Sequence, residues 1–199
     1  TIMTSPKILV MAGSLRTGSS NARLAALVAK ELALADADVT RISFADYSLP
    51  IFDADFMADS GLPPEALKLR SMLTAHQGVF IASPEYSASV SPLIKNAIDW
   101  LSRARDKNEA NYAAFKGRVF ALGSASPGSG AGVRGLMALR QILELGCGAL
   151  VLPEQITVGR AAQAFDEMDN LKDEAVAATL KTAARRLVEM ASLMPRTAA

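Results

Sequence analysis

The chain has 199 residues, of which 50% are hydrophobic and 21% are charged, as in an ordinary globular domain. Its formal net charge is +1, so no overall field favours nucleic acid or an anionic membrane, and we expect neither as a partner. The lone Cys147 excludes an intramolecular disulfide, and the lone His76 excludes a histidine-rich metal site, so we expect no metal. Because there is neither a long apolar run nor a signal-peptide pattern at the start, we predict no transmembrane helix and a cytoplasmic location.

Short apolar runs alternate with segments of helical periodicity along the chain. Strands are predicted at 7–12, 39–44, 78–82, 118–122 and 149–152, and helices at 21–35, 63–75, 91–103, 133–145 and 173–193. Residues 47–62, rich in Asp, Pro and Ser, are predicted to form a long loop whose role the sequence leaves open. Nearly continuous apolar strands separated by helices indicate a parallel sheet covered on both faces. We therefore predict one doubly wound α/β domain spanning residues 1–199.

The loop after the first predicted strand, residues 13–21, has the composition of a phosphate-binding loop. It contains two glycines, three serines, an asparagine and one arginine, Arg16, just before a helix. Backbone N–H groups at a helix start, hydroxyl groups and a guanidinium are donors suited to phosphate. Helix capping by Ser20 or Asn21 explains one or two of these residues, but not Arg16 beside three hydroxyls. Gly13 and Gly18 have Walker A spacing, but Ser19 replaces the required lysine, so a monophosphate is favoured over a triphosphate.

The loop after the third predicted strand carries a second motif. It reads Ser83-Pro84-Glu85-Tyr86-Ser87-Ala88-Ser89 and leads into a helix containing Leu93-Ile94-Lys95-Asn96-Ala97-Ile98-Asp99-Trp100. This stretch resembles the PEY-x-x-S…LKNAIDW motif of the NADPH-dependent FMN reductases, a family of flavodoxin-like enzymes that includes quinone, chromate and azo-dye reductases. The first loop resembles the family's GS-x-R-x-x-S-x-N motif through Gly13, Ser14, Arg16, Ser19 and Asn21. The resemblance extends to about residue 150.

The resemblance implies a flavodoxin-like fold, with a five-stranded parallel sheet in the order 2-1-3-4-5, and bound FMN. The FMN phosphate would be held by Ser14, Arg16, Ser19, Ser20 and Asn21. The isoalloxazine ring would lie along Pro84, Glu85, Tyr86 and Ser87, largely through backbone groups, although family members often carry Asn where Ser87 stands. Ser124, Ser126 and Gly128, in the loop after the fourth strand, would lie near the ring edge and the nicotinamide. Lys95, Asn96, Asp99 and Trp100 are interpreted as helix or subunit-contact residues rather than ligands.

The resemblance also implies a reaction. NADPH or NADH would give hydride to flavin N5 in a ping-pong cycle without a catalytic side chain, and a small acceptor would then take the electrons. Quinones, free flavin, azo compounds and metal oxyanions all remain candidate acceptors, and we expect a homodimer or homotetramer. Two alternatives stay open. One is a flavodoxin-type electron carrier without NAD(P)H oxidase activity. The other is a Rossmann dehydrogenase that uses Gly130, Gly132 and Gly135, which match G-x-G-x-x-G but lie several residues past the predicted strand.

Overall fold

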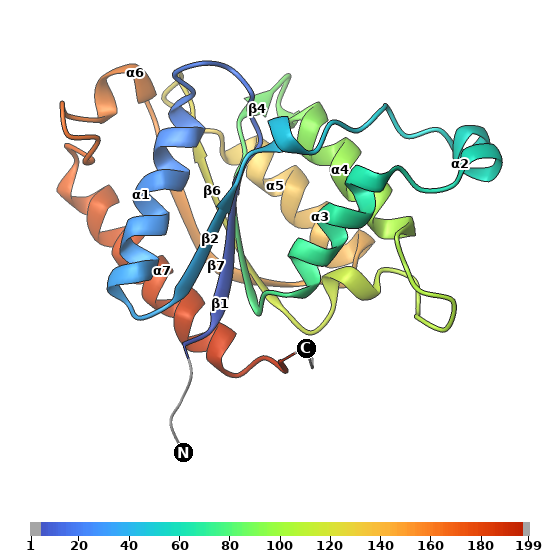
Figure 1. Cartoon of the computed structure of the whole chain (residues 1–199). Coiled ribbons are helices and arrows are strands. Elements are labelled where there is room, and N and C mark those ends of the chain that lie inside the picture. The colour runs from blue at the N-terminus through green and yellow to red at the C-terminus, as the bar shows by residue number, and fades with distance from the viewer. Residues whose placement is uncertain (1–4, 197–199) are drawn as a thin grey trace.

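A five-stranded parallel sheet forms the centre of the protein, in a computed structural model that describes residues 5–196. Its strands are β1 (Lys7–Ala12), β2 (Asp38–Ile42), β3 (Gly78–Ala82), β6 (Val119–Ala125) and β7 (Leu150–Val158), arranged in the order β2-β1-β3-β6-β7 (Figure 1). Numbered by their place in this sheet alone, the strands follow the order 2-1-3-4-5. The predicted flavodoxin-like arrangement is therefore confirmed.

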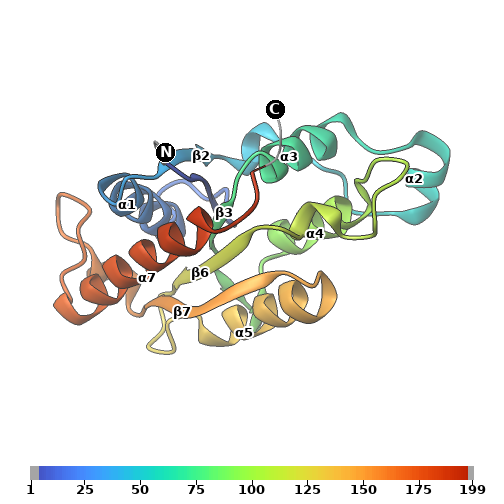
Figure 2. The same cartoon turned by 90° about the horizontal axis from the view of Figure 1, so that it is seen from below.

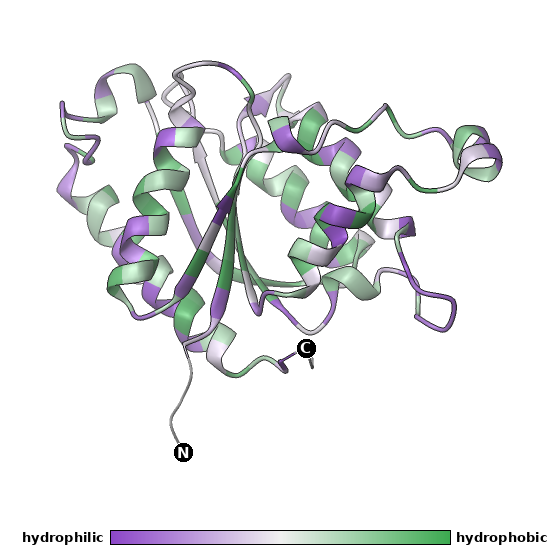
Figure 3. Ribbon diagram, viewed as in Figure 1, coloured by the Kyte–Doolittle hydropathy of each residue, from purple (hydrophilic) through white to green (hydrophobic). Residues whose placement is uncertain are grey.

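Helices cover both faces of this sheet. The helices α1 (Ser20–Leu34) and α7 (Glu174–Ser192) lie on one face, and α3 (Pro64–Thr74), α4 (Pro92–Arg103) and α5 (Val133–Gln141) lie on the other (Figures 1 and 2). Ile8 and Val10 of β1 belong to the core under α1 and α7, whereas Leu9 and Met11 belong to the second core. This alternation follows from the two-residue period of a strand. In Figure 3, hydrophobic colour is concentrated on the inner strands and on the helix faces turned towards them.

The last two strands are longer than predicted. The strand β6 continues to Ala125 instead of ending at residue 122, and β7 runs to Val158 instead of ending at residue 152. The register between them shifts, because Phe120 pairs with Val151 while Leu122 pairs with Gln155. Pro153 and Glu154 lie within this irregularity, where a proline is tolerated. Their presence interrupts the apolar pattern, which explains why the sequence predicts only the first part of β7.

Residues 47–62, predicted to be a loop, form an arm that contains the short helix α2 (Ala54–Ser60) and projects from the body (Figure 1). Two residues of the LKNAIDW-like segment in α4 hold the arm. Asn96 donates to the carbonyl of Pro50 and accepts from the N–H of Phe52, and Trp100 Nε1 also donates to Pro50, all at 2.8 Å. The Phe52 ring meets Trp100 edge-on. Asn96 and Trp100 thus hold the arm against α4, which is a structural task and agrees with their interpretation as non-ligand residues.

Smaller elements complete the fold. They are η1 (Phe44–Asp46), β4 (Glu85–Tyr86), β5 (Ser89–Val90), η2 (Ala113–Phe115), the π-helical turn η3 (Ile142–Gly146) and α6 (Ala161–Ala164). The strands β4 and β5 form a separate antiparallel hairpin beyond the carboxyl end of β3.

Among residues 5–196, no helix combines the length and apolar character needed to cross a bilayer.

Candidate nucleotide-binding site

A hollow of about 120 Å³ lies at the carboxyl edge of the sheet, where the loops after β1, β3 and β6 meet. Its lining includes most of the residues that the sequence predicts, namely Ser14, Arg16, Ser19, Ser20, Asn21, Pro84, Glu85, Tyr86 and Ser126, together with Ala125 and Pro127. Three segments far apart in the sequence are therefore brought together here. Ser87, Ser124 and Gly128, which were also predicted, do not line the hollow.

The loop after β1 ends at the start of α1 and leaves backbone donors free there. Ser19 caps the helix, with its hydroxyl accepting from the N–H of Ala22. The N–H groups of Ser20 and Asn21 have no acceptor among residues 5–196, as expected for a first helical turn. The positive end of the helix dipole lies at the same place. The local geometry therefore suits an anion.

Arg16 places a cation at the mouth of this hollow. Its guanidinium folds over the loop and donates to the carbonyls of Thr17 and Gly18, each at 3.2 Å. The hydroxyl of Ser14 accepts from the Arg16 N–H at 3.3 Å. The side chain stays exposed, and a guanidinium has five N–H donors, so it can still bind a ligand.

Asn21 has a structural task that the sequence does not reveal. Its side chain is buried, and its amide makes two hydrogen bonds of 2.9 Å with the backbone of Ala125, one to the carbonyl and one from the N–H. Both polar groups of the side chain are thereby engaged at the end of β6. Asn21 lines the hollow, but its side chain serves mainly to hold the first loop against the third.

The loop after β3 contains the β4–β5 hairpin, whose two turn residues are left-handed. Ser87 has φ 49° and Ala88 has φ 60°, as in the two-residue turns that suit the strand twist of a hairpin. Asn adopts this left-handed conformation more readily than other non-glycine residues, so an Asn would fit the backbone at position 87. Ser87 is not among the residues that line the hollow, and its contact with a ligand stays a prediction.

Glu85 lines the hollow but turns its carboxylate towards α5. One oxygen accepts from the Gly135 N–H at 3.0 Å, and the other forms an ion pair with Arg134 at 2.5 Å. The Gly135 hydrogen bond, supported by Arg134, holds the pKa of the Glu85 carboxyl below its ordinary value despite partial burial. The one carboxylate in the lining is therefore already neutralised by protein groups.

The loop after β6 brings its glycines together with Ser124 and Glu85. Gly132 is left-handed at φ +79°, and a Cβ there would lie 1.9 Å from Ser124 Oγ. The Ser124 hydroxyl beneath it is fully buried and has no hydrogen-bond partner among residues 5–196. A Cβ on Gly135 would lie 3.1 Å from the backbone of Glu85. Packing thus explains Gly132 and Gly135 of the G-x-G-x-x-G match. The first glycine of that match, Gly130, does not directly follow β6, which ends at Ala125. The geometry therefore does not support a Rossmann fingerprint.

The fold and the site define a class. In a 2-1-3-4-5 sheet the topological switch point lies between the first and third strands, and it is there that flavodoxin-like proteins bind a mononucleotide. In this chain the hydroxyl-rich loop after β1 lies beside the loop after β3 at that point. The protein is a flavodoxin-like α/β protein.

Comparison with known proteins identifies the family. The family model of NADPH-dependent FMN reductases matches residues 6–163. A quinone reductase of Escherichia coli is 37% identical over 138 residues, which is 69% of each chain. An NAD(P)H-dependent FMN reductase of Pseudomonas aeruginosa is 34% identical over 170 residues, 84% of this chain and 85% of the relative. The structure of FerB from Paracoccus denitrificans, a flavoenzyme NAD(P)H:(acceptor) oxidoreductase, superposes with a TM-score of 0.76 at 26% identity, covering 95% of this chain and 98% of FerB.

The chain belongs to the NADPH-dependent FMN reductase family. It is therefore a flavin-dependent oxidoreductase that uses NAD(P)H. The two alternative hypotheses from the sequence, a flavodoxin-type electron carrier and a Rossmann dehydrogenase, are therefore not supported.

Proposed function

We propose that this enzyme binds FMN in the hollow at the carboxyl edge of the sheet and uses NADPH or NADH to reduce a small acceptor. The donor set around the start of α1 carries this proposal. The names of the relatives support a quinone as the first acceptor to test, because the Escherichia coli relative is a quinone reductase. Bound FMN supplies the hydride chemistry, while the protein binds, orients and shields it.

The loop after β1 fits the phosphate of FMN. The free N–H groups of Ser20 and Asn21, the hydroxyls of Ser14 and Ser20, and the Arg16 guanidinium converge on one hollow. We assign Ser19 to capping the helix that presents these donors. The only carboxylate in the lining, Glu85, is held by Gly135 and Arg134, so it does not oppose an anion. Charge and hydrogen bonding therefore both favour a terminal phosphate.

The hollow accounts for only part of the cofactor. Its volume of about 120 Å³ is below the roughly 300–1,000 Å³ of enclosed ligand pockets. We therefore place the phosphate end in the hollow and the ring outside it, along Pro84, Tyr86 and Ser87. In this proposal Ser126 and Gly128 belong to the opposite wall, whereas Ser124, which is fully buried, does not reach the cofactor. Tyr86 is exposed, so an acceptor could approach the ring from solvent.

We further propose that the enzyme is a cytoplasmic homo-oligomer built from one FMN-binding domain. The arm formed by residues 47–62 supports association, since it projects from the body and exposes Ile51 and Phe56. Apolar side chains on a projecting segment are suited to burial against a second copy. The single cysteine, free and buried, is compatible with a reducing compartment.

Flavin binding by an Arg16 variant tests the function directly. Titration of the purified protein with FMN, followed by its visible spectrum, should show saturable binding and subsequent NAD(P)H oxidation with a quinone. Arg16→Ala should weaken FMN binding on the order of tenfold to a hundredfold, because a charge-assisted hydrogen bond is lost. Arg185→Ala, an exposed arginine on α7, is the matched control and should bind FMN normally. A wild-type protein that binds no flavin would overturn the proposal, and normal affinity in Arg16→Ala would remove Arg16 from the phosphate site.

A further inference from the structure

The loop between β6 and α5 contains two glycines that the fold does not require. A Cβ on Gly128 or Gly130 would meet no atom of the described residues within 4 Å, and neither glycine has the positive φ that favours this residue type. Gly132 and Gly135 differ, because a Cβ would clash with Ser124 at the first and crowd the backbone of Glu85 and Ser89 at the second. Glycine leaves a backbone bare so that another group can approach it closely. The bare backbone of Gly128–Gly130, which we name the crest, is therefore better explained by a ligand than by folding.

The crest presents backbone donors to solvent. The N–H groups of Gly128, Ser129 and Gly130 have no acceptor within the described part of the chain, and all three residues are exposed. The crest carbonyls, in contrast, are partly used, since the Gly128 carbonyl accepts from Ala131 and Arg160. Successive free N–H groups of this kind form an anion-binding surface.

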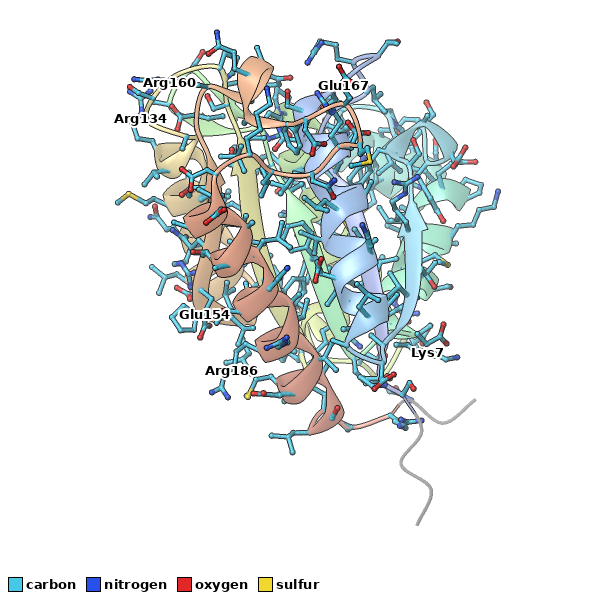
Figure 4. The ribbon with its side chains drawn as sticks, turned by 90° about the vertical axis from the view of Figure 1, so that its left-hand side faces the viewer. Lys7, Arg134, Glu154, Arg160, Glu167 and Arg186 are labelled. Carbon is cyan, nitrogen blue, oxygen red and sulfur yellow. The ribbon has the colours of Figure 1, made fainter. Side chains whose placement is uncertain are left out.

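Two arginines flank the crest. The backbone N–H of Arg160 donates to the Gly128 carbonyl at 3.2 Å, so Arg160 is fixed beside the crest by its main chain. The exposed guanidinium of Arg160 makes no hydrogen bond or ion pair with residues 5–196. The backbone of Arg160 is left-handed, with φ 48°. Arg134 follows the crest along the chain, in the first turn of α5, and uses only one nitrogen on Glu85. Figure 4 shows both arginines at the same upper corner of the molecule.

A cavity of about 270 Å³ opens beside Arg160, next to the crest. Its wall combines apolar side chains with a few polar groups: Val158, Ala164, Leu171, Val176, Ser129, Gly159, Arg160 and Asp173. Asp173 uses one carboxylate oxygen to cap α7. An apolar wall suits a purine, and carboxylate and hydroxyl groups suit ribose hydroxyls.

We propose that the crest binds the diphosphate of NADH or NADPH, with the guanidinium groups of Arg134 and Arg160 beside it, and that the cavity beside Arg160 binds the adenosine. This inference rests on the proposed function and locates the co-substrate of that reaction. Ser126 and Pro127 line the flavin hollow directly before the crest, while Ser129 lines the cavity directly after Gly128. One extended dinucleotide can thus cross the crest, with its nicotinamide end directed to the flavin.

Substitution of Gly130 and Arg160 tests the inference. In Gly130→Val the new side chain projects from the surface without contacting other described residues, so folding should be unaffected. The same side chain would obstruct the proposed path of the diphosphate. Arg160→Gln removes one of the two cations. Gly146→Val is the matched glycine control, because a Cβ there also meets no atom and its φ is not positive. Arg186→Gln is the matched arginine control, and Figure 4 shows it far from the crest.

Two measurements on the FMN-loaded enzyme separate the outcomes. Calorimetric titration with ADP reports on the adenosine-diphosphate site without turnover, and steady-state kinetics give KM separately for NADH, NADPH and quinone. We expect Gly130→Val and Arg160→Gln to weaken ADP binding and to raise KM for both nucleotides by about tenfold or more. FMN affinity and KM for quinone should stay at wild-type values in both variants and in both controls.

The inference fails if both crest variants bind ADP and NAD(P)H as the wild type does, or if the wild-type enzyme oxidises NAD(P)H but binds no ADP. An equal loss in Gly146→Val would also overturn it, by showing a general effect of adding a side chain. The proposed function fails in a different way, through a wild-type protein that binds no FMN. The two failures are therefore distinguishable.

Discussion

The carboxylate of Glu85 accepts a 3.0 Å hydrogen bond from the N–H of Gly135, in the first turn of a helix that has no capping side chain of its own. The N-cap residue of α5 is Gly132, and its first turn contains no acidic residue. A residue 50 positions earlier thus supplies the missing acceptor. Two loops that we assign to the cofactor are joined by this bond, so displacement of one should displace the other.

Replacement of Glu85 by Ala should destabilise the protein by about 1–3 kcal/mol, because the Gly135 N–H loses its acceptor. Glu85→Gln keeps an acceptor and should cost less. The pKa of Glu85 in the folded protein lies below its ordinary 4.5, so its contribution is present above that pH and is lost as pH falls below it. Urea unfolding from pH 7 to pH 3 measures both effects. Equal stability of wild type and Glu85→Ala would contradict the capping role.

Replacement of Asn21 by Ala should both destabilise the fold and weaken FMN binding. The substitution leaves the buried N–H and carbonyl of Ala125 without their partner, at a cost on the order of 1–3 kcal/mol. Urea unfolding and FMN titration give the two readouts. Asn108→Ala, at an exposed position, is the control and should match the wild type. If Asn21→Ala unfolds at the wild-type urea concentration, the proposed connection between the loops is wrong.

Cys147 should be unreactive in the native protein. Burial raises the pKa of its thiol to about 11, so almost no thiolate exists near neutral pH. We expect slow labelling by iodoacetamide at pH 8, and fast labelling in urea. Gln141→Cys in a Cys147→Ala background puts a cysteine at an exposed site and should react fast in the native state. Native labelling of Cys147 at the rate of that control would contradict its burial.

The same pKa shift predicts an alkaline effect on stability. Between pH 9.0 and about 11, the unfolded chain loses the thiol proton while the folded protein keeps it. The free energy of unfolding should therefore fall as the pH increases from 9.0 to about 11. Cys147→Ala should lack this component of the pH dependence, as thermal unfolding at several alkaline pH values will show.

Association through the arm predicts a change in mass. Ile51 is 78% exposed on the arm, and Ile51→Glu would place a charge in the proposed subunit contact. We expect light scattering to give a multiple of the chain mass for the wild type and a smaller mass for Ile51→Glu. Leu34→Glu is the control, since Leu34 is similarly exposed at 71% but lies at the end of α1. A monomeric wild type, or an unchanged mass for Ile51→Glu, would refute association through the arm.

The apolar runs predicted all five strands of the main sheet, and the family resemblance implied their order, which the structure confirms. They were insufficient for the end of β7, since Pro153 and Glu154 break the pattern there, and for α2, whose seven residues carry no apolar stripe. The resemblance implied that one cofactor touches the loops after β1, β3 and β6, and these loops do meet at one edge of the sheet. It could not show that Asn21 binds the backbone of Ala125 across 104 residues, or that Glu85 faces α5 rather than a ligand. Such contacts depend on the register in which the loops meet, which no local pattern encodes.

The bond between Asn21 and Ala125 has a consequence for redesign. Together with the contact of Glu85 and Gly135, it makes the three walls of the hollow mutually dependent, so random variation of whole loops would mostly yield misfolded protein. Tyr86 and Pro127 line the same hollow, and neither side chain makes a hydrogen bond within the described chain. Focused libraries at these two positions should therefore alter acceptor preference while leaving the scaffold intact.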